Sequence, residues 1–504
     1  MVQGTGSGAG KSLIAAALCR IFRDKGVDVA PFKAQNMALN SAITRDGGEM
    51  GRAQVLQAEA ARVEPTVDMN PILLKASGEM GSQVIIQGKV HSCMKARDYY
   101  AFKETAWEAV KQSFDRLGQQ HELIILEGAG SPAEINLMDV DIVNMAAARY
   151  AKAPVLLVGD IDKGGVFASL YGTVKLLGRQ SKFIKGFIIN KFRGDPAILE
   201  PGLDMIHAKT GKPVVGVLPY IYDIGLPEED GLALQKISNF KSRISSLEMI
   251  KVVVVRLKYI SNFTDFDPLQ HEPDAELLYS ANHADIENAD LVIIPGSKNT
   301  VKDLLFLREH GLDTSIKRAH AKGIQIIGMC GGYQMSGQKI FDPYGVESSN
   351  ATVDGLGLLN IETTFGKKKT TCQVEAELID GAVTGNSLFS QLRGYEIHMG
   401  ESTGDIGLFK LNNISSTDER RTSAAGPVLD GSRNKNCWGT YLHGIFENDL
   451  FRRSILNMVR TQKGLPPLND ISSYGEIKEK ALNALADIVR EHLDMKFIEK
   501  LAGL

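Results

Sequence analysis

The sequence has few cysteines, no long apolar run and almost no net charge, and each of these absences excludes a class of protein. The cysteines are odd in number and scattered, which predicts neither a disulfide framework nor a C-x-x-C metal site: Cys19, Cys93, Cys330, Cys372 and Cys437. No stretch approaches the ~20 apolar residues of a membrane helix, and no basic segment followed by an apolar core opens the chain. A net charge of −3 gives no reason to expect nucleic acid or an anionic membrane as partner. We therefore expect a cytoplasmic protein that binds neither.

The length and the apolar pattern predict an α/β protein with two main domains. A chain of 504 residues exceeds one hydrophobic core. Continuous apolar runs at 123–130, 153–162 and 183–192 alternate with helical patterns, which indicates a parallel sheet covered on both faces. A second strand-rich series begins at residue 250. The predicted organisation is a first domain over 1–225, a connection over 226–249, a second domain over 250–450 and a helical extension over 451–504.

The segment "GTGSGAGKS" (4–12) predicts a phosphate-binding loop between a short strand and an apolar helix. Glycines allow backbone N–H groups to close on an anion, and the helix N-terminus adds a favourable dipole. Lys11 would reach the β- and γ-phosphates, and the Ser12 hydroxyl would join a Mg²⁺ shell. The match to G-x-x-x-x-G-K-S is imperfect, because Thr5 stands at the first glycine position and Gly4 precedes it. The predicted nucleotide contacts of this loop are Gly4, Thr5, Gly8, Gly10, Lys11 and Ser12.

Polar residues that close the predicted strands are candidates for the rest of this site, because ligands of parallel sheets lie beyond the carboxyl ends of the strands. Glu127 in "ILEGAG" ends a buried run, where binding a metal would offset the cost of burying a carboxylate. Asp160 and Lys163 in "GDIDKGG" are similar, and Asn190 in "INKF" could contact a purine base. Each residue alone could equally be a strand-end cap. Together they favour an ATP·Mg²⁺ site.

Two polar stretches of the first domain could contact a substrate. "PFKAQNMALNS" carries Lys33, Gln35 and Asn36 and has few core positions, so it could hold an anionic substrate against the γ-phosphate. "EINLMDVDIVNMA" carries Asp139 and Asp141, which could contact a metal or an acyl-phosphate intermediate. For the first stretch a solvated loop is the alternative.

The segment "QIIGMCGGYQM" (325–335) predicts a nucleophile elbow, in which a strand turns sharply into a helix and exposes Cys330. Gly328 and Gly332 frame the cysteine, as the strained turn requires, and the helix N-terminus favours a thiolate. The backbone N–H of Gly331 would face a developing oxyanion, and the glycine turn at Gly296 and Ser297 could complete the hole. A buried structural cysteine is the alternative.

A thiolate nucleophile requires an imidazole base, and two histidines end strand-like segments. They are His443 in "GTYLHGIFEN" and His398 in "YEIHMGES". We favour His443, because it follows a predicted core strand and Gly444 comes directly after it.

These motifs resemble those of the glutamine-dependent cobyric acid synthases of cobalamin biosynthesis over essentially the whole chain. "QGTGSGAGKS", "PFKAQNMALNS", "LEGAGSPAEINLMDVDIVNM", "GDIDKGGVFAS" and "NKFRGD" resemble that family's synthetase domain, which is similar to dethiobiotin synthetase. "IPGSKNT", "GMCGGYQM", "GYEIHMG" and "GTYLHGIFEN" resemble its class I glutamine amidotransferase domain. The resemblance implies an α/β fold in which a P-loop parallel-sheet synthetase domain precedes a class I glutamine amidotransferase-like domain.

The resemblance also implies a reaction. The b, d, e and g carboxylates of adenosylcobyrinic a,c-diamide would be amidated, with glutamine and this corrinoid acid as substrates, ATP and Mg²⁺ as cofactors and no tightly bound organic cofactor. Cys330 would attack the glutamine amide while His443 moves protons. The P-loop site would form an acyl phosphate that ammonia attacks. The oligomeric state is not predicted.

One departure and two competing interpretations accompany this resemblance. Other class I amidotransferases carry a glutamate two residues after the catalytic histidine, and here that position is Ile445. We therefore expect a Cys–His dyad, with Glu447 as a candidate orienting acid. The competing interpretations are a cobyrinic a,c-diamide synthase or other P-loop amidoligase, and a partitioning-type ATPase switch with an inactive amidotransferase-like module. The early P-loop followed by "FKAQNM" disfavours the first, and the intact Cys330 and His443 disfavour the second.

Overall fold

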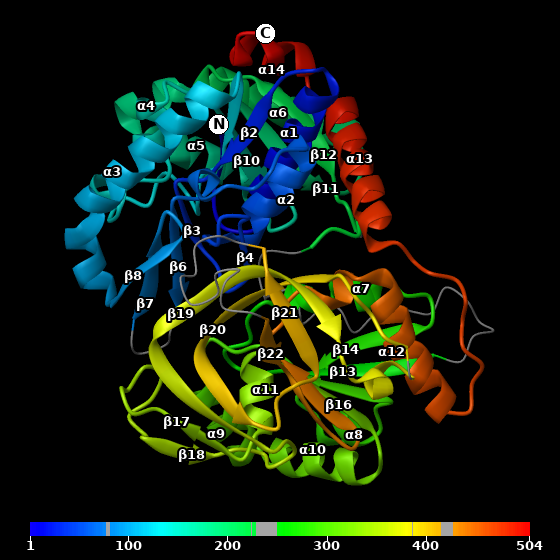
Figure 1. The fold of residues 1–504 in the computed structure, drawn as a ribbon. Helices are drawn as coiled ribbons and strands as arrows, with labels where there is room; N and C mark the ends of the chain where they lie inside the picture. The colour runs from blue at the N-terminus through cyan, green and yellow to red at the C-terminus, as the bar shows by residue number, and fades with distance from the viewer. Residues whose placement is uncertain (77–80, 223, 228–248, 386, 415–426) are drawn as a thin grey trace.

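Two parallel β-sheets, one in each half of the chain, organise the protein, and the two halves lie against each other (Figure 1). The computed structural model describes residues 1–504 apart from 77–80, 223, 228–248, 386 and 415–426. Most of the connection predicted over 226–249 therefore lies outside the described residues. Among the residues that are described, no helix is both long and apolar enough to cross a membrane.

The main sheet of the first domain is parallel, as the continuous apolar runs predict. Its strand order is β1-β10-β11-β12, and a single parallel bridge from Val2 to Glu127 extends it into the parallel pair β2-β9. The strands are β1 (Val2–Gly4), β2 (Val29–Phe32), β9 (Leu123–Leu126), β10 (Val155–Asp160), β11 (Ile184–Phe192) and β12 (Val214–Pro219). The helices that accompany them are α1 (Lys11–Asp24), α2 (Arg52–Ala61), α4 (Met145–Tyr150), α5 (Val166–Leu176) and α6 (Pro196–Thr210). The phosphate loop and Glu127 thus follow strands whose carboxyl ends share one edge.

A smaller sheet in the first domain has no counterpart in the sequence predictions. It has the order β3-β6-β7-β8, and a short antiparallel hairpin, β4-β5, lies apart from it. These strands are β3 (Gln35–Met37), β4 (Ser41–Ile43), β5 (Glu49–Gly51), β6 (Ile72–Ala76), β7 (Ser82–Ile86) and β8 (Lys89–Met94). The long helix α3 (Ala96–Gln120) packs against this sheet. The polar stretch after Pro31 is therefore partly strand.

The second domain combines a parallel sheet with an antiparallel layer (Figure 1). The first has the order β14-β13-β15-β16-β24-β23, and only the edge strand β23 runs antiparallel. Its strands are β13 (Ile250–Val255), β14 (Ala275–Ser280), β15 (Leu291–Ile294), β16 (Gln325–Met329), β23 (Ser432–Asn434) and β24 (Cys437–Thr440). Its helices are α7 (Asp267–Gln270), α8 (His283–Glu287), α9 (Thr300–Glu309), α10 (Leu312–Ala321) and α11 (Gly331–Ser336).

The antiparallel layer is built around β19 (Ile361–Leu378), the stretch whose polar and apolar residues alternate. Alternate residues along this part of the strand are buried, namely Val374, Ala376 and Leu378, as a half-buried strand requires. Its companions are β17 (Lys339–Phe341), β18 (Thr352–Asp354), β20 (Leu392–Gly404), β21 (Phe409–Asn413) and β22 (Val428–Asp430).

The helical segment predicted over 451–504 divides between the two domains. Helix α12 (Asp449–Gln462) buries Phe451, Ile455 and Leu456 in the core of the second domain. Helix α13 (Tyr474–His492) returns to the first domain, packs on α1 and places Leu482 and Leu485 in its core. Helix α14 (Met495–Ala502) ends the chain there (Figure 1). The end of the chain therefore ties the domains together.

Candidate active site

Cys330 sits in a strained turn between β16 and α11, as the glycine spacing predicts. Its φ of 50° and ψ of −106° lie where side chains are unfavourable, which costs about 1–3 kcal/mol. A Cβ on Gly332 would lie 1.9 Å from the Ile294 carbonyl oxygen, and one on Gly328 would lie 2.8 Å from the Gly332 oxygen. Only glycine fits either position, so the flanking glycines have a packing role that keeps the elbow sharp.

His443 lies beside this elbow because β16 and β24 are parallel neighbours that end at the same edge. Nε2 of His443 is buried without a hydrogen-bond partner among the described residues, and the Cys330 thiol, which is among the groups that raise the pKa of His443, donates to the Ile397 carbonyl oxygen at 3.6 Å. Burial lowers the pKa of His443, but Asp265 and the thiol outweigh burial and raise it to about 10. The imidazole is thus poised to carry the proton of the thiol.

An acid that the sequence analysis did not identify contacts the other side of the imidazole. Nδ1 of His443 lies 2.6 Å from Oδ2 of Asp265, which is on the short 3-10 helix η7 (Phe263–Phe266), and Oδ1 of Asp265 accepts the Gly444 N–H at 3.1 Å. Glu447 instead pairs with Arg52 of the first domain at 2.6 Å. The expected dyad is therefore corrected to a Cys–His–Asp arrangement. No local motif could have identified Asp265, because 178 residues separate it from His443.

His398, the alternative base, is engaged elsewhere. Its Nδ1 lies 2.7 Å from the Gly400 carbonyl oxygen, its Nε2 lies 3.2 Å from Glu396, and its ring stacks on Tyr441. It lines the same cavity as Cys330, but both ring nitrogens already have partners. This geometry favours His443 as the base.

The residues predicted for the oxyanion hole lie together. A Cβ on Gly331 would lie 2.8 Å from the Ser297 nitrogen, and one on Gly296 would lie 3.5 Å from Cε1 of His443. The Ser297 hydroxyl donates to Asp303 at 2.6 Å, which fixes the turn. The turn at Gly296 and Ser297 therefore borders both the elbow and the imidazole.

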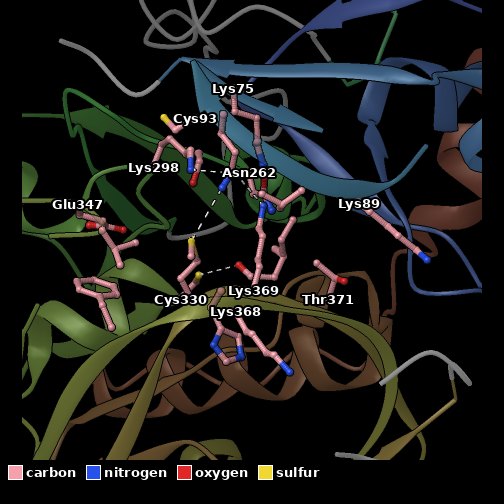
Figure 2. A pocket seen from close by; sticks show the side chains of 18 of the residues that line it. Lys75, Lys89, Cys93, Asn262, Lys298, Cys330, Glu347, Lys368, Lys369 and Thr371 are labelled. Carbon is pink, nitrogen blue, oxygen red and sulfur yellow. Dashed lines mark hydrogen bonds between the residues drawn. The ribbon is translucent and has the colours of Figure 1, made fainter. Parts of the chain in front are cut away.

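A cavity of about 910 Å³, which we call the thiol cavity, opens beside Cys330 and is lined by both domains (Figure 2). The first domain contributes Lys75 and Cys93, and the second contributes Lys298, Glu347 and Lys369 (Figure 2). Gln83 of the first domain lines the same cavity. None of these six was predicted as a site residue from the sequence, because strands and loops of two separate domains bring them together.

Charged groups of both signs line the thiol cavity, as a zwitterionic amino acid requires. Oε2 of Glu347 accepts the Thr300 N–H at 2.6 Å, and burial raises the pKa of this carboxyl to about 7. Burial lowers the pKa of the Lys298 ammonium, which lies 3.2 Å from Gln83. Lys75 and Lys369 share the buried Glu49 carboxylate across the domain boundary at 2.8 and 2.6 Å.

A second cavity of about 860 Å³, which we call the P-loop cavity, lies in the first domain. Its walls bring together nine of the predicted site residues: Gly8, Gly10, Lys11, Ser12, Lys33, Gln35, Asn36, Glu127 and Asp141. Gly8 and Gly10 have φ of 70° and 95°, so glycine suits both turns of the loop. Lys11 donates to the Gly6 and Gly130 carbonyl oxygens at 2.9 and 3.3 Å. Asp141 accepts the N–H groups of Val143 and Asn144, which precede α4, and of Ala146 in its first turn.

Glu127 is a buried carboxylate of the P-loop cavity that contacts residues from several segments. Its Oε1 lies 2.9 Å from both the Ser12 hydroxyl and the Lys33 ammonium, and its Oε2 accepts from Gln57 at 2.6 Å. Mg²⁺ takes one or two protein oxygens and completes its shell with water and phosphate. The adjacent Ser12 and Glu127 oxygens fit such a site.

The other predicted residues of the first domain do not line this cavity. Asn190 donates to the Ala9 carbonyl oxygen at 2.9 Å and accepts the Lys191 N–H, so both ends of its carboxamide are engaged within the protein. Asp160 pairs with Lys191 at 2.9 Å. Gly4 and Thr5 lie at the end of β1, and Asp139 and Lys163 are exposed. Among the lining residues that the sequence analysis missed are Lys103, which no motif marks, and Lys191, which stands in "NKFRGD" directly after Asn190.

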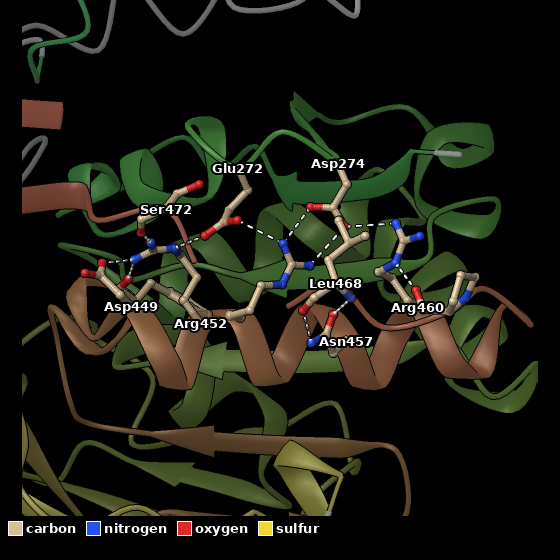
Figure 3. A network of polar contacts seen from close by, with 11 residues as sticks. Glu272, Asp274, Asp449, Arg452, Asn457, Arg460, Leu468 and Ser472 are labelled. Carbon is tan, nitrogen blue, oxygen red and sulfur yellow. Dashed lines mark hydrogen bonds and ion pairs between the residues drawn. The ribbon is translucent and has the colours of Figure 1, made fainter. Parts of the chain in front are cut away.

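A buried network of ion pairs joins α12 to Glu272 and Asp274, which follow η7 and α7 in the chain (Figure 3). Arg452 of α12 pairs with Glu272 at 2.6 Å and donates to the Phe446 carbonyl oxygen at 2.7 Å. Arg453 pairs with Glu272 at 2.9 Å and with Asp274 at 2.7 Å. The network thus joins α12 to the segments that follow Asp265 and His443.

Comparison with known proteins identifies both domains. A CobQ/CobB/MinD/ParA nucleotide binding domain matches residues 1–233, and a CobB/CobQ-like glutamine amidotransferase domain matches residues 251–451. A cobyric acid synthase of Thermodesulfovibrio yellowstonii is 49% identical over 100% of this chain and 99% of its own. The cobyric acid synthase of Caldanaerobacter subterraneus subsp. tengcongensis is 48% identical over 99% of this chain and 98% of its own. That of Salmonella agona is 47% identical over 98% of this chain and 96% of its own. These matches confirm the resemblance and the α/β fold class, and the chain belongs to the cobyric acid synthase family.

Proposed function

We propose that the chain amidates the b, d, e and g carboxylates of adenosylcobyrinic a,c-diamide, with ammonia released from glutamine in the thiol cavity and used in the P-loop cavity. Glutamine-dependent amidation in cobalamin biosynthesis is the activity of the family to which the chain belongs. A cytoplasmic location is part of the proposal, and the five free cysteines agree with it.

Glutamine hydrolysis begins with the Cys330 sulfur, whose proton resides on His443. The sulfur adds to the amide carbon of glutamine, and the N–H groups around Ser297 and Gly331 stabilise the oxyanion. The C–N bond breaks as His443 protonates the leaving nitrogen, which gives ammonia and a glutamyl thioester. Water then attacks the thioester, His443 accepts its proton, and glutamate leaves. Asp265 keeps the imidazole in the required orientation throughout.

In the P-loop cavity the acceptor carboxylate attacks the γ-phosphorus of ATP. ADP leaves, an acyl phosphate forms, and ammonia displaces phosphate from the acyl carbon to give the amide. Lys11 and Lys33 lie where they could neutralise phosphate and carboxylate oxygens. Ser12 and Glu127 would hold Mg²⁺, which supplies charge neutralisation at the phosphates. Ammonia kept inside the protein remains unprotonated, which favours placing both sites in one chain.

The observation that carries this proposal is the Cys330–His443–Asp265 geometry beside a cavity shared with the P-loop domain. The test is Cys330→Ala, assayed once with glutamine and once with ammonium. We expect amide synthesis from glutamine to be lost and synthesis from ammonium to be retained. Loss of both would contradict the division of labour. The mass of the product counts the amides added, which separates this function from that of a cobyrinic a,c-diamide synthase.

A further inference from the structure

Asn40 belongs to the wall of the P-loop cavity and also contacts the second domain. Its side chain is 2% exposed, and its Oδ1 accepts the Phe263 N–H at 3.0 Å across the domain boundary. Because a backbone N–H must donate to an oxygen, this bond places Oδ1 of the carboxamide toward Phe263 and leaves Nδ2 on its other side. Nδ2 is buried at the cavity wall and has no hydrogen-bond partner among the described residues. A buried donor without a partner costs free energy, which points to a ligand atom that accepts from it.

The contact made by Asn40 leads directly to the imidazole of the thiol cavity. Phe263 begins η7, the short helix that presents Asp265 to His443. Asn262, the preceding residue, has a φ of 52°, its Oδ1 accepts the Ser41 N–H at 3.2 Å, and its Nδ2 lies 3.4 Å from Nδ1 of His443. Residues 40 and 41 therefore hold a strained turn whose next residues orient the base.

A second contact between the same two places supports the connection. Arg52 lines the P-loop cavity and pairs at 2.6 Å with Glu447, which ends η10 (Ile445–Glu447) directly after His443. The Arg52 N–H also donates to the Asn40 carbonyl oxygen at 3.3 Å. Asn40 and Arg52 of the P-loop cavity thus contact η7 and η10, the two segments that flank His443 in the thiol cavity.

We propose that Asn40 is a positioning residue shared by both sites. Its side-chain Nδ2 donates to an oxygen of the acyl acceptor, and its side-chain Oδ1 keeps η7 in place so that Asp265 stays on His443. This inference rests on the proposed function. An acceptor oxygen on Nδ2 stabilises the orientation of the carboxamide that holds Phe263, so acceptor binding favours the competent glutaminase site. The coupling is reciprocal, and glutamine in the thiol cavity strengthens acceptor binding.

The experiment measures glutamine hydrolysis with and without adenosylcobyrinic a,c-diamide plus ATP·Mg²⁺, together with amide synthesis from ammonium. In the unaltered chain the acceptor is expected to stimulate hydrolysis. In Asn40→Ala the stimulation falls by about tenfold or more, since the ligand contact and the bond to Phe263 are both lost. The alkaline limb of hydrolysis also moves to lower pH, because Asp265 no longer supports the imidazolium. Asn40→Asp keeps an oxygen for Phe263 but repels the acceptor, so it loses the stimulation with a smaller shift of the limb.

Gln373→Ala is the matched control. Gln373 donates to the Ile43 carbonyl oxygen at 2.7 Å and lines neither cavity. The substitution therefore removes one hydrogen bond of the same domain interface. This variant is expected to keep both the stimulation and the pH limb. The inference is overturned if Asn40→Ala keeps both, or if Gln373→Ala loses both to the same extent. If Asn40→Ala does not fold, Asn40→Asp decides alone, and retained stimulation there overturns the inference. Failure of the proposed function looks different, because the unaltered chain would then form no amide from either nitrogen source.

Discussion

The phosphate loop and the thiol cavity are built in different ways. The phosphate loop is one contiguous segment, residues 4–12, that connects β1 to α1, and its conformation depends on its own glycines. The thiol cavity takes Asp265, Cys330 and His443 from three separate segments and lysines from both domains. A contiguous loop tolerates changes elsewhere in the fold, whereas a site assembled from distant segments depends on whatever holds those segments. The thiol cavity is therefore the more vulnerable of the two.

The largest effect is expected from Glu272→Gln, which breaks the buried network behind Asp265. Arg452 and Arg453 would lose a carboxylate within 2.9 Å while remaining buried, which costs about 3 kcal/mol of unfolding free energy. The two tryptophans lie in different domains, Trp107 on α3 and Trp438 on β24. Denaturant unfolding followed through Trp438 in a Trp107→Phe background measures the loss where it should occur.

The control for this prediction is Glu476→Gln, the same change at an exposed pair with Lys480. Exposed pairs of this kind contribute little, so we expect no measurable change in unfolding. Equal destabilisation by both variants would show that the buried network does not set the stability of the second domain. Synthesis from ammonium should outlast synthesis from glutamine as Glu272→Gln is warmed.

The next effect is on catalysis, through Asp265→Asn. We expect glutamine-dependent synthesis to fall by about 10²-fold, because the imidazole loses the acid that orients it. Synthesis from ammonium should not change. Glu447→Gln is the matched control: it removes the acid that the sequence suggested, which pairs with Arg52 and not with His443. A larger loss in Glu447→Gln than in Asp265→Asn would reverse the assignment.

The same variant has a pH signature with a definite sign. Burial lowers the pKa of His443, but Asp265 and Cys330 outweigh burial and raise it to about 10, so the imidazolium persists until the pH rises through that value. Without the carboxylate the imidazolium loses its proton at lower pH, toward its ordinary pKa of about 6.5. The alkaline limb of glutamine hydrolysis should therefore move down in Asp265→Asn. An unmoved limb would mean that Asp265 does not support the charge.

The contrast between local and assembled sites also explains what the sequence could and could not predict. The phosphate loop, the Cys330 elbow and the parallel sheets were predictable because short-range glycine spacing and apolar runs specify them. Asp265 was missed, and Glu447 was considered instead, because nothing near His443 in sequence records that η7 lies against it. Asn190 shows the converse limit: a strand-end amide fits a base contact or a cap equally, and here both ends of its side chain bond backbone groups.

The smallest effect is expected from a helix cap in the first domain. Asp195 caps α6 by accepting the Ala197 N–H at 2.9 Å, and Asp195→Ala should cost about 1 kcal/mol. The loss should appear in the transition reported by Trp107 in a Trp438→Phe background, and glutamine hydrolysis should keep its rate and pH limb. Asp195 lines neither cavity. The variant therefore tests whether a loss of stability in the first domain also lowers the stability of the second. If the transition that Trp438 reports in a Trp107→Phe background shifts equally, α13 and the interface make the two domains unfold as one unit. The thiol cavity is then no more vulnerable than the loop.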